Sequence, residues 1–267
     1  MKIGILSKRK IMLTGKIKQC LENKGHQVKI YTQKELNINS SLFDNDFYIL
    51  KSKGLFYIYA GYFLEANNIP VFPNPRVSYL QKNRVHSHYL MKKYGLLRPG
   101  IFIGTQKTLK NKLEKEDFPL ILKPIMGSGS KGVRMIKFYN DFTSENNEII
   151  YLEKYVEGIH YNVYFIEDQI CVLVKPPLSH EHVPMEKVET PNDIKDIIKK
   201  WRDNLNENAL FGHFDIVREN KSNKLYTVDV GSFPEFSNWK IENISPVEKI
   251  CELILQSMHK HINNQNN

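Results

Sequence analysis

The residues of this chain best suited to binding a phosphate lie in the segment Phe118–Ile136, which reads FPLILKPIMGSGSKGVRMI. Apolar runs on both sides of a Gly/Ser turn predict a β-hairpin. Lys123 closes the first apolar run, and an ammonium group buried there needs an anionic partner because an unpaired buried charge is costly. Small residues in the turn let backbone N–H groups approach phosphate oxygens, and Lys131 adds a second positive charge. The small residues are Gly127, Ser128, Gly129, Ser130 and Gly132.

The hairpin alone permits two interpretations. Taken by itself, such a loop is more often a surface feature with solvated lysines than a phosphate site. A later segment favours a lid over a nucleotide triphosphate: Glu153-Lys154-Tyr155-Val156 ends a predicted strand about 30 residues after Lys123. A hinge between strand and loop there would present backbone N–H and C=O groups to an adenine edge. This second signal is weak by itself, because strands often end in charged residues.

Two carboxylates further along the chain are candidates for holding a cation. Asp215 lies within the apolar segment GHFDIVRE, and Asp229 follows fourteen residues later in LYTVDVGSFPEF. Neighbouring strands joined by a short turn can place both carboxylates on one face, where their repulsion favours a cation between them. Oxygen ligands next to a phosphate substrate indicate Mg²⁺. The alternative is that both acids pair with nearby lysines, but their occurrence with the hairpin favours the metal.

The first 75 residues must form the scaffold on one side of these groups. Apolar runs alternating with helical periodicity predict a parallel sheet, whose ligands bind at the carboxyl ends of the strands. Lys51 and Lys53 lie at one such end. The predicted strands are Lys2–Leu6, Gln27–Tyr31, Phe47–Lys51 and Ile69–Phe72, and the predicted helices are Gly15–Lys24 and Tyr57–Asn67.

The remaining residues supply the elements that carry the candidate groups. One helix is predicted over residues 76–97; it bears Arg84, His86 and His88 and ends at Gly95. Further helices are predicted at Pro191–Asn204 and from Pro246 to about His261. Strands are predicted at Ile149–Val156, Tyr161–Glu167, Gln169–Lys175, Phe214–Arg218 and Leu225–Val230.

Composition narrows the class of protein. The chain has 267 residues and a formal net charge of +9, yet its basic residues are spread without a dense run. This argues against nucleic acid and suits small anionic substrates, although lysine-rich codon usage explains the charge equally well.

No apolar stretch approaches the roughly 20 residues that span a bilayer, and the N-terminus has the reverse order of a signal peptide. Three distant cysteines in apolar contexts are predicted to be free thiols, so we expect a cytoplasmic protein without a membrane contact; they are Cys20, Cys171 and Cys251.

In their order and spacing, these motifs resemble the ATP-grasp superfamily over nearly the whole chain. The segments MKIGILSKRK, KGHQV and VFPNP and the late EKI helix resemble most the RimK-like amino-acid (glutamate) ligases. The resemblance implies an α/β fold with an N-terminal Rossmann-like α/β domain and two α+β subdomains around the nucleotide. The expected divisions are residues 1–75, residues 76–156 with the helix 76–97 as connector, and residues 157–267.

The resemblance also implies roles for individual residues. Lys123, Lys131 and Arg84 would contact the phosphates of ATP, the segment 153–156 would bind adenine, and Asp215 and Asp229 would hold Mg²⁺. His160 stands where an acid is expected near the ribose, and Lys175 lies near the positions where ligases carry arginines that steady an acyl phosphate. Family chemistry transfers the γ-phosphoryl of ATP to a carboxylate, and an amine then attacks the acyl phosphate.

Departures from the family pattern leave the acceptor open. The usual metal-binding pattern is Glu-x-Asn, whereas this chain has Asp229-Val230-Gly231 and lacks the third side-chain ligand. Arg84 replaces a lysine, and Asn162 and Pro176 stand where ligases carry arginines. The inositol tris/tetrakisphosphate kinases share the fold, and their motifs resemble Asn83-Arg84, the FDIVR segment and the DVGSFP segment; His180, His182 and Lys175 would suit a polyphosphate acceptor. The GSGSKG loop and the N-terminal segment favour the ligase, and a regulator without catalysis is a third possibility compatible with Gly231.

Overall fold

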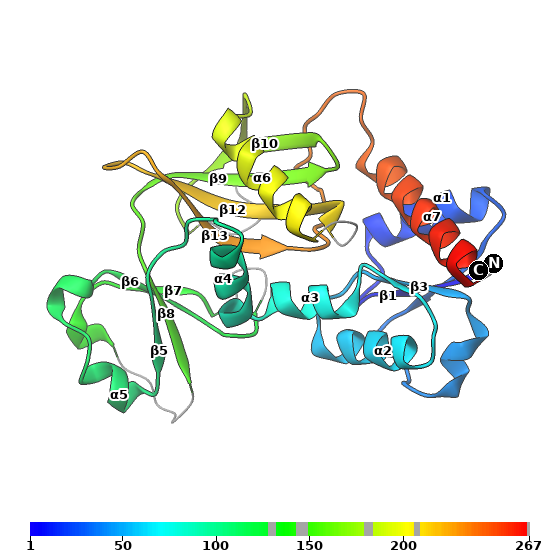
Figure 1. The fold of residues 1–267 in the computed structure, drawn as a ribbon, viewed down its shortest axis with the longest axis horizontal. Helices are drawn as coiled ribbons and strands as arrows, with labels where there is room; N and C mark the ends of the chain where they lie inside the picture. The colour runs from blue at the N-terminus through cyan, green and yellow to red at the C-terminus, as the bar shows by residue number, and fades with distance from the viewer. Residues whose placement is uncertain (128–131, 143–148, 179–183, 206–208, 266–267) are drawn as a thin grey trace.

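The described residues form three β-sheets, each with helices packed beside it (Figure 1). The computed structural model describes residues 1–127, 132–142, 149–178, 184–205 and 209–265. The N-terminal sheet lies at one end, the smaller antiparallel sheet at the other, and the larger antiparallel sheet beside both. This arrangement confirms the predicted α/β class.

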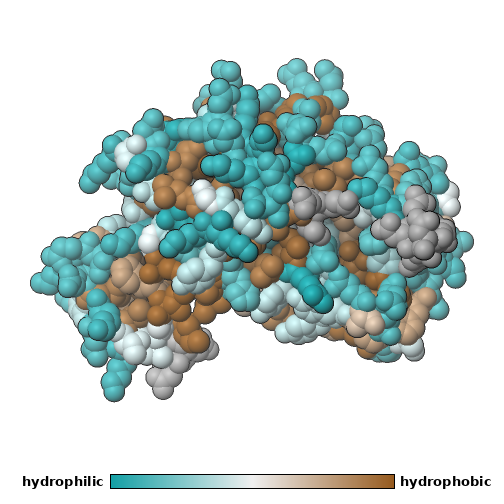
Figure 2. All heavy atoms as spheres, viewed as in Figure 1, coloured by the Kyte–Doolittle hydropathy of each residue, from teal (hydrophilic) through white to brown (hydrophobic). Residues whose placement is uncertain are grey.

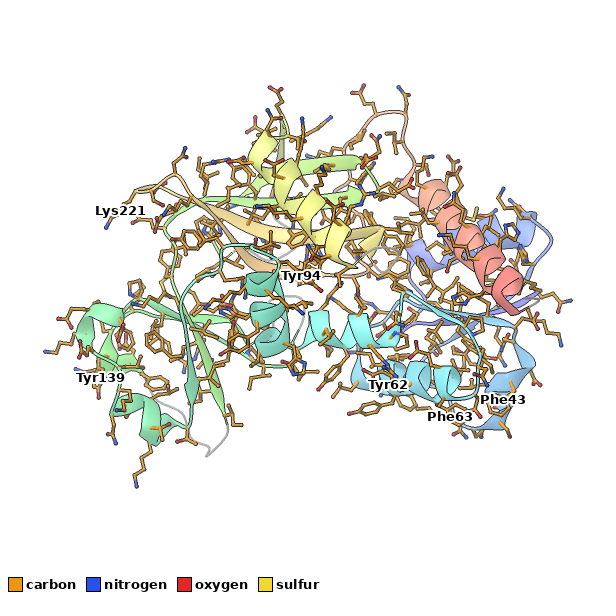
Figure 3. All side chains as sticks on the ribbon, in the orientation of Figure 1. Phe43, Tyr62, Phe63, Tyr94, Tyr139 and Lys221 are labelled. Atoms are coloured by element: carbon orange, nitrogen blue, oxygen red, sulfur yellow. A yellow bond between two sulfur atoms is a disulfide. The ribbon has the colours of Figure 1, made fainter. Side chains whose placement is uncertain are left out.

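The N-terminal sheet is parallel throughout, as predicted. Its strand order is β2-β1-β3-β4, with β1 at Lys2–Leu6, β2 at Gln27–Tyr31, β3 at Phe47–Leu50 and β4 at Val71–Phe72. Helices α1 (Met12–Asn23) and α2 (Leu55–Ala66) begin slightly earlier than predicted. Phe63 of α2 stacks on Phe43 of the short 3-10 helix η1 (Ser40–Asp44), with ring centroids 5.5 Å apart (Figure 3).

The C-terminal helix α7 (Pro246–Gln265) returns to the N-terminal sheet and lies beside α1, so that the two chain ends are close together (Figure 1). Its buried residues share one core with Ile3, Ile5 and Ile17. This packing joins the end of the segment 157–267 to the segment 1–75. The predicted domain boundaries at residues 76 and 157 remain a proposal.

The smaller sheet contains the predicted hairpin. Its order is β5-β8-β6-β7, all antiparallel, with β5 at Ile101–Gly104, β6 at Leu120–Lys123, β7 at Arg134–Ile136 and β8 at Ile150–Lys154. Helix α5 (Gln106–Lys110) and the 3-10 helices η2 (Lys115–Asp117) and η3 (Tyr139–Asp141) accompany it. Figure 2 shows apolar residues gathered over this sheet, whereas much of the rest of this face is hydrophilic.

The larger sheet has the order β11-β10-β9-β12-β13 and is antiparallel. Its strands are β9 (Gly158–Ile166), β10 (Gln169–Lys175), β11 (Glu186–Val188), β12 (Phe211–Glu219) and β13 (Leu225–Gly231). Helix α6 (Asn192–Leu205) covers one face and packs Trp201 edge-on against Phe214. On the opposite face, some residues pack into the core shared with the N-terminal sheet, and the others lie outside both cores.

The predicted single helix over residues 76–97 is wrong, because the chain forms two helices, α3 (Pro75–Lys82) and α4 (Arg84–Lys93). Asn83 separates them with an extended backbone, and its side-chain oxygen accepts hydrogen bonds from the N–H groups of Val85 and His86. Such an N-cap starts a new helix. The break also frees the N–H of Arg84 to bond the carbonyl of Ile125 at 3.0 Å, which ties the connector to the loop after β6.

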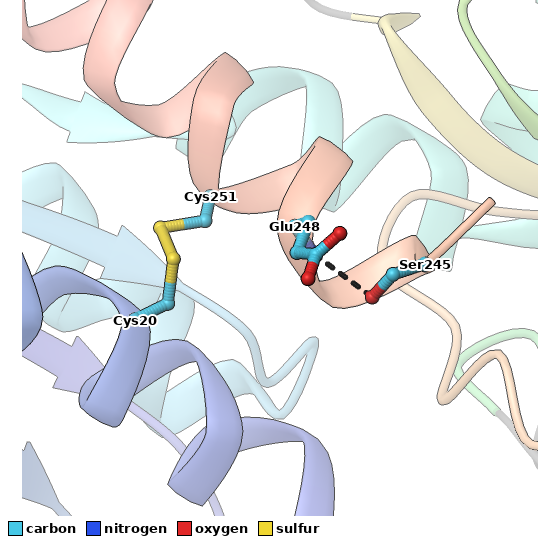
Figure 4. Close-up of a disulfide and its surroundings, with 4 residues drawn as sticks. All are labelled: Cys20, Ser245, Glu248 and Cys251. Carbon is cyan, nitrogen blue, oxygen red and sulfur yellow. Dashed lines mark hydrogen bonds between the residues drawn. A yellow bond between two sulfur atoms is a disulfide. The ribbon is translucent and has the colours of Figure 1, made fainter. Parts of the chain in front are cut away.

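The prediction of three free thiols is also wrong. Cys20 of α1 and Cys251 of α7 form a disulfide, and only Cys171 is free and buried (Figure 4). Because α7 folds back on α1, two cysteines 231 residues apart in sequence become neighbours. With this disulfide present, the cysteines no longer indicate a reducing compartment. In the described part of the chain, no helix is both long and apolar enough to cross a membrane.

Reduction of the disulfide is expected to destabilise the fold. A cross-link that closes so long a loop restricts the unfolded chain, and its removal typically costs about 2–5 kcal/mol. We expect reductant to lower the thermal unfolding midpoint of the native protein, and Cys20→Ser with Cys251→Ser to unfold at that lower temperature with or without reductant. Cys171→Ser is the matched control, which should keep its response to reductant. An unchanged midpoint on reduction of the native protein would contradict this.

Candidate active site

One cavity lies between the smaller and the larger antiparallel sheet, and most of the predicted site residues line it. It also contacts apolar side chains, among them Ile121, Val133 and Leu178. The predicted residues that line it are Arg84, Lys123, Glu153, Lys154, Tyr155, Val156, His160, Lys175, Asp215 and Asp229. Gly127 lies against the Arg84 guanidinium nearby. Ser128, Gly129, Ser130 and Lys131 lie outside the described residues, as do His180 and His182.

Strand alternation explains why polar groups face this cavity. Phe214 and Ile216 of β12 belong to the core beneath α6, so Asp215 between them points to the opposite face. Asp229 of β13 is its direct partner across the two strands, and a register irregularity follows Asp215. The prediction that the strand pair brings both carboxylates together on one face is therefore confirmed.

The two carboxylates have different surroundings. Asp215 accepts a hydrogen bond from Lys175 at 2.7 Å, so the lysine pairing considered as an alternative is present for this acid. Asp229 has no such direct ion pair among the described contacts and accepts from the N–H of Val230 at 3.0 Å. Burial alone would raise the pKa of Asp229, but the positive charges of Arg84, Lys123 and Lys53 hold this pKa below its usual value.

These carboxylates fit a magnesium–nucleotide complex better than a metal ion held by protein alone. Within the described ranges, no three His, Cys, Asp or Glu side chains gather closely enough to hold a metal ion. Mg²⁺ usually takes one or two carboxylates and completes its shell with phosphate oxygens and water. Asp215 and Asp229 supply that pair, on a cavity wall that also carries cationic side chains.

Lys123 takes part in a buried ion cluster that joins the two sheets. Glu153 accepts hydrogen bonds from Lys123, from Arg98 at 2.9 Å and from Tyr151 at 2.6 Å. Lys123 also donates to the carbonyl of Val228 on β13 at 3.1 Å. Burial would raise the pKa of Glu153, but Lys123 and Arg98 hold this pKa below its usual value, so the carboxylate stays charged. Because the Glu153 carboxylate is already bonded to Lys123 and Arg98, a contact with adenine at this position would come from the Glu153 backbone.

Arg98 is a site residue that the sequence analysis missed. Only 3% of its side chain is exposed, and it donates to the carbonyl of Thr227 at 2.6 Å as well as to Glu153. It also lies beside His88, whose pKa falls to about 4 because of burial and the Arg98 charge. Because Glu153 carries one negative charge and is shared by two cations, the cluster keeps a net positive charge at the cavity. In sequence, Arg98 is a lone arginine in a loop, which gives no signal of this contact.

Arg84 is placed by the helix break described above. Its guanidinium donates to the carbonyl of Pro124, at the start of the loop whose small residues were predicted to bind phosphate. An added side chain at Gly127 would press against that guanidinium. The structure thus places Arg84 at the base of this hairpin, and its contact with the phosphates remains a prediction.

His160 lies on the same sheet face as Asp215 and Lys175. It is the cross-strand partner of Lys175, and its Nε2 atom is buried without a hydrogen-bond partner. Burial, helped by the Lys175 charge, lowers the pKa of His160 to about 4, so the ring is neutral near pH 7. A neutral imidazole can donate or accept a hydrogen bond, which suits a ribose hydroxyl.

Two further groups close the end of the site near the N-terminal sheet. Lys53 follows β3 and is close enough to Asp229 for their charges to interact; burial lowers the pKa of Lys53 to about 8 against the attraction of Asp229. His213 of β12 lies opposite Gly231 of β13, and its Nδ1 atom is buried without a partner. Lys53 was expected at the end of a strand, whereas no pattern in the sequence marked His213.

Comparison with known proteins identifies the family. The sequence model described as "ATP-grasp domain" matches residues 82–230, more than half of the chain. The chain belongs to the ATP-grasp family. The match extends from Lys82, at the end of α3, to Val230 of β13 and so includes the predicted site residues. No curated protein sequence matches the chain.

Solved structures of low sequence identity share the fold. A RimK domain protein ATP-grasp from Sphaerobacter thermophilus has a TM-score of 0.78 at 9% identity and covers 96% of this chain and 100% of its own. The D-alanine–D-alanine ligase from Bacillus anthracis has a TM-score of 0.69 at 16% identity and covers 100% of both chains. The ATP-grasp ligase PsnB, solved with a minimal precursor, Mg and ADP, has a TM-score of 0.67 at 13% identity and covers 96% of this chain and 98% of its own.

Loss of Arg98 should destabilise the ATP-grasp fold far more than loss of an arginine that pairs with a half-exposed acid. Arg98→Met removes one partner of a fully buried pair and is expected to lower the free energy of unfolding by about 3–5 kcal/mol. The control is Arg218→Met, which breaks a two-pronged pair with the half-exposed Asp193 and should cost at most about 1 kcal/mol. Denaturant unfolding measures both. Equal losses in the two variants would show that the buried cluster does not hold the sheets together.

Proposed function

We propose that this ATP-grasp protein is an ATP- and Mg²⁺-dependent carboxylate–amine ligase that acts through an acyl phosphate. The observation that carries the proposal is the pair Asp215 and Asp229, which face one cavity together with Lys123 and Arg84. Paired carboxylates beside fixed cations suit a triphosphate with its magnesium ion.

In this proposal, ATP lies between the two antiparallel sheets. The adenine occupies the apolar part of the cavity near Ile121 and the segment 154–156, with backbone groups at its edge. Lys123 and Arg84 bind the phosphates, and the net positive charge of the Glu153 cluster keeps Lys123 available for an anion. Asp215 and Asp229 would hold Mg²⁺, which when bound neutralises phosphate charge.

The reaction breaks the bond between the γ-phosphorus of ATP and the β–γ bridging oxygen, and that oxygen leaves with ADP. A carboxylate oxygen of the acceptor forms the new bond to phosphorus. An amine then attacks the acyl carbon, and inorganic phosphate leaves. Lysine and arginine groups fixed around the phosphoryl group stabilise its charge during transfer, which accounts for most of such catalysis.

The proposal of a ligase draws support from the similar structures, since two of the three proteins described above are named ligases and match over 100% and 98% of their own chains. A second candidate is a kinase acting on a polyphosphorylated alcohol such as an inositol phosphate. One observation favours it: Lys51, Lys53, Lys82 and Arg84 are close enough for their charges to interact, which suits an acceptor with several negative charges. Both candidates take a small anionic acceptor.

Release of phosphate from γ-labelled ATP separates the two candidates. With a ligase, labelled phosphate should become free only when both a carboxylic acid and an amine are present, as screened with pairs of amino acids. With a kinase, the label should move to an inositol phosphate. Lys123→Ala should lower either turnover by at least about 100-fold. Lys221→Ala, at the exposed turn between β12 and β13, is the control (Figure 3). ATP bound without any acceptor-dependent turnover would indicate a regulator instead.

Asp229→Asn should weaken the dependence of turnover on Mg²⁺. The substitution keeps the size of the side chain but removes its charge, so we expect the Mg²⁺ concentration at half-maximal rate to rise by about tenfold or more. Asp193→Asn, which changes a surface acid on α6, is the control. A Mg²⁺ titration that coincides with that of the native protein would exclude Asp229 as a ligand.

A further inference from the structure

The corner of the site at Gly231 differs from the family pattern in a way that the structure explains. On the cavity face of β12 and β13, Asp215 is opposite Asp229 and His213 is opposite Gly231. The family usually carries an asparagine ligand at the position of Gly231. A Cβ atom at residue 231 would overlap the imidazole of His213 and would lie 3.0 Å from the Nζ atom of Lys53. The space of the missing ligand is therefore filled by an imidazole and an ammonium group.

Lys53 is held in this corner by its neighbours. The preceding lysine, Lys51, is buried and donates to the carbonyl of Phe233 at 3.0 Å, so the end of β3 is fixed to the chain that follows β13. Lys51 also lies 3.8 Å from Glu235 and over the Phe233 ring. The short segment after β3 thus brings Lys53 to Gly231, with Asp229 as its nearby opposite charge.

This corner does not fit a second metal ion. Gly231 offers no side-chain ligand, and a divalent cation beside the Nδ1 atom of His213 would be repelled by the ammonium of Lys53 at close range. Two-metal phosphoryl-transfer sites place their ions about 3.5–4 Å apart, and each ion needs its own ligands. Asp215 and Asp229 both line the nucleotide cavity, where one ion would be held.

We propose that Lys53 acts in place of a metal ion at the Gly231 corner and that the site holds a single divalent cation. The proposal rests on the proposed use of ATP and Mg²⁺. During transfer, Lys53 keeps its proton and donates hydrogen bonds to oxygens of the phosphoryl group, while Asp215 and Asp229 would hold the one cation. A lysine ammonium is a compact charge with three donors, which suits this task. Lys53 would thus be a catalytic residue supplied by the N-terminal sheet.

Counting bound metal ions tests this without turnover. Mn²⁺ replaces Mg²⁺, and electron paramagnetic resonance measures Mn²⁺ bound per chain at saturating AMPPNP, an ATP analogue that is not hydrolysed. We expect one ion for the native chain. The variant Lys53→Met, His213→Ala, Gly231→Asn restores the side-chain ligand, removes the overlap and the ammonium, and should bind two. Two ions of similar affinity on the native chain would overturn the proposal.

The second measurement is turnover of Lys53→Met. Its phosphoryl transfer should fall by about 100-fold or more, as for the loss of one stabilising donor, while AMPPNP affinity and the count of one Mn²⁺ stay unchanged. Lys221→Met is the matched control and should retain native turnover. Native turnover in Lys53→Met would also overturn the proposal. If the native chain binds no AMPPNP, the proposed function itself fails. If it binds AMPPNP together with two ions, only the role of Lys53 fails.

Discussion

The buried carboxylate of Glu153 is the group on which the rest of the site depends. Its oxygens are shared by Lys123 of β6, Arg98 of the loop before β5 and Tyr151 of β8, and both cations also bond carbonyls of β13. A charge so deeply buried is tolerated only with its partners in place. The cluster therefore fixes the smaller sheet against the larger one, and it fixes Lys123 at the cavity between them. The same charged side chains hold the two sheets together and set the charge of the site, so a change in one alters the other.

The larger sheet solves a second problem, since the same strands must support a core and a polar site. Alternate residues of β9, β10, β12 and β13 enter the core beneath α6. On the other face, the strands carry apolar residues where they meet the N-terminal sheet and polar ones beside the cavity, as with Phe211 and Asp215. The boundary runs between them at His213. This boundary explains why His213 lies between aromatic core residues and the two carboxylates, and why its Nδ1 atom is buried without a hydrogen-bond partner.

Sequence reasoning succeeded where the relevant partners were close along the chain. The hairpin at Phe118–Ile136 and the pairing of Asp215 with Asp229 follow from apolar runs separated by short turns, and both are confirmed. It failed where partners are distant. Arg98 meets Glu153 across 55 residues, and Cys20 meets Cys251 across 231, and neither contact leaves a periodic signal. The helix break at Asn83 was missed for another reason: helical periodicity continues through it, and only the capping side chain marks the new start.

The charges of the site also bear on the strongly basic composition. Around the cavity and its N-terminal corner, Lys53, Arg84, Arg98, Lys123 and Lys175 outnumber the carboxylates Glu153, Asp215 and Asp229. The site is therefore cationic before any ligand binds, and a triphosphate with a single divalent cation would bring the negative charge that balances it. A second divalent ion at the Gly231 corner, in addition to Lys53, would increase the excess of positive charge. No further anion would be present to balance it. The glycine, the histidine opposite it and the lysine beside it thus form one consistent electrostatic arrangement.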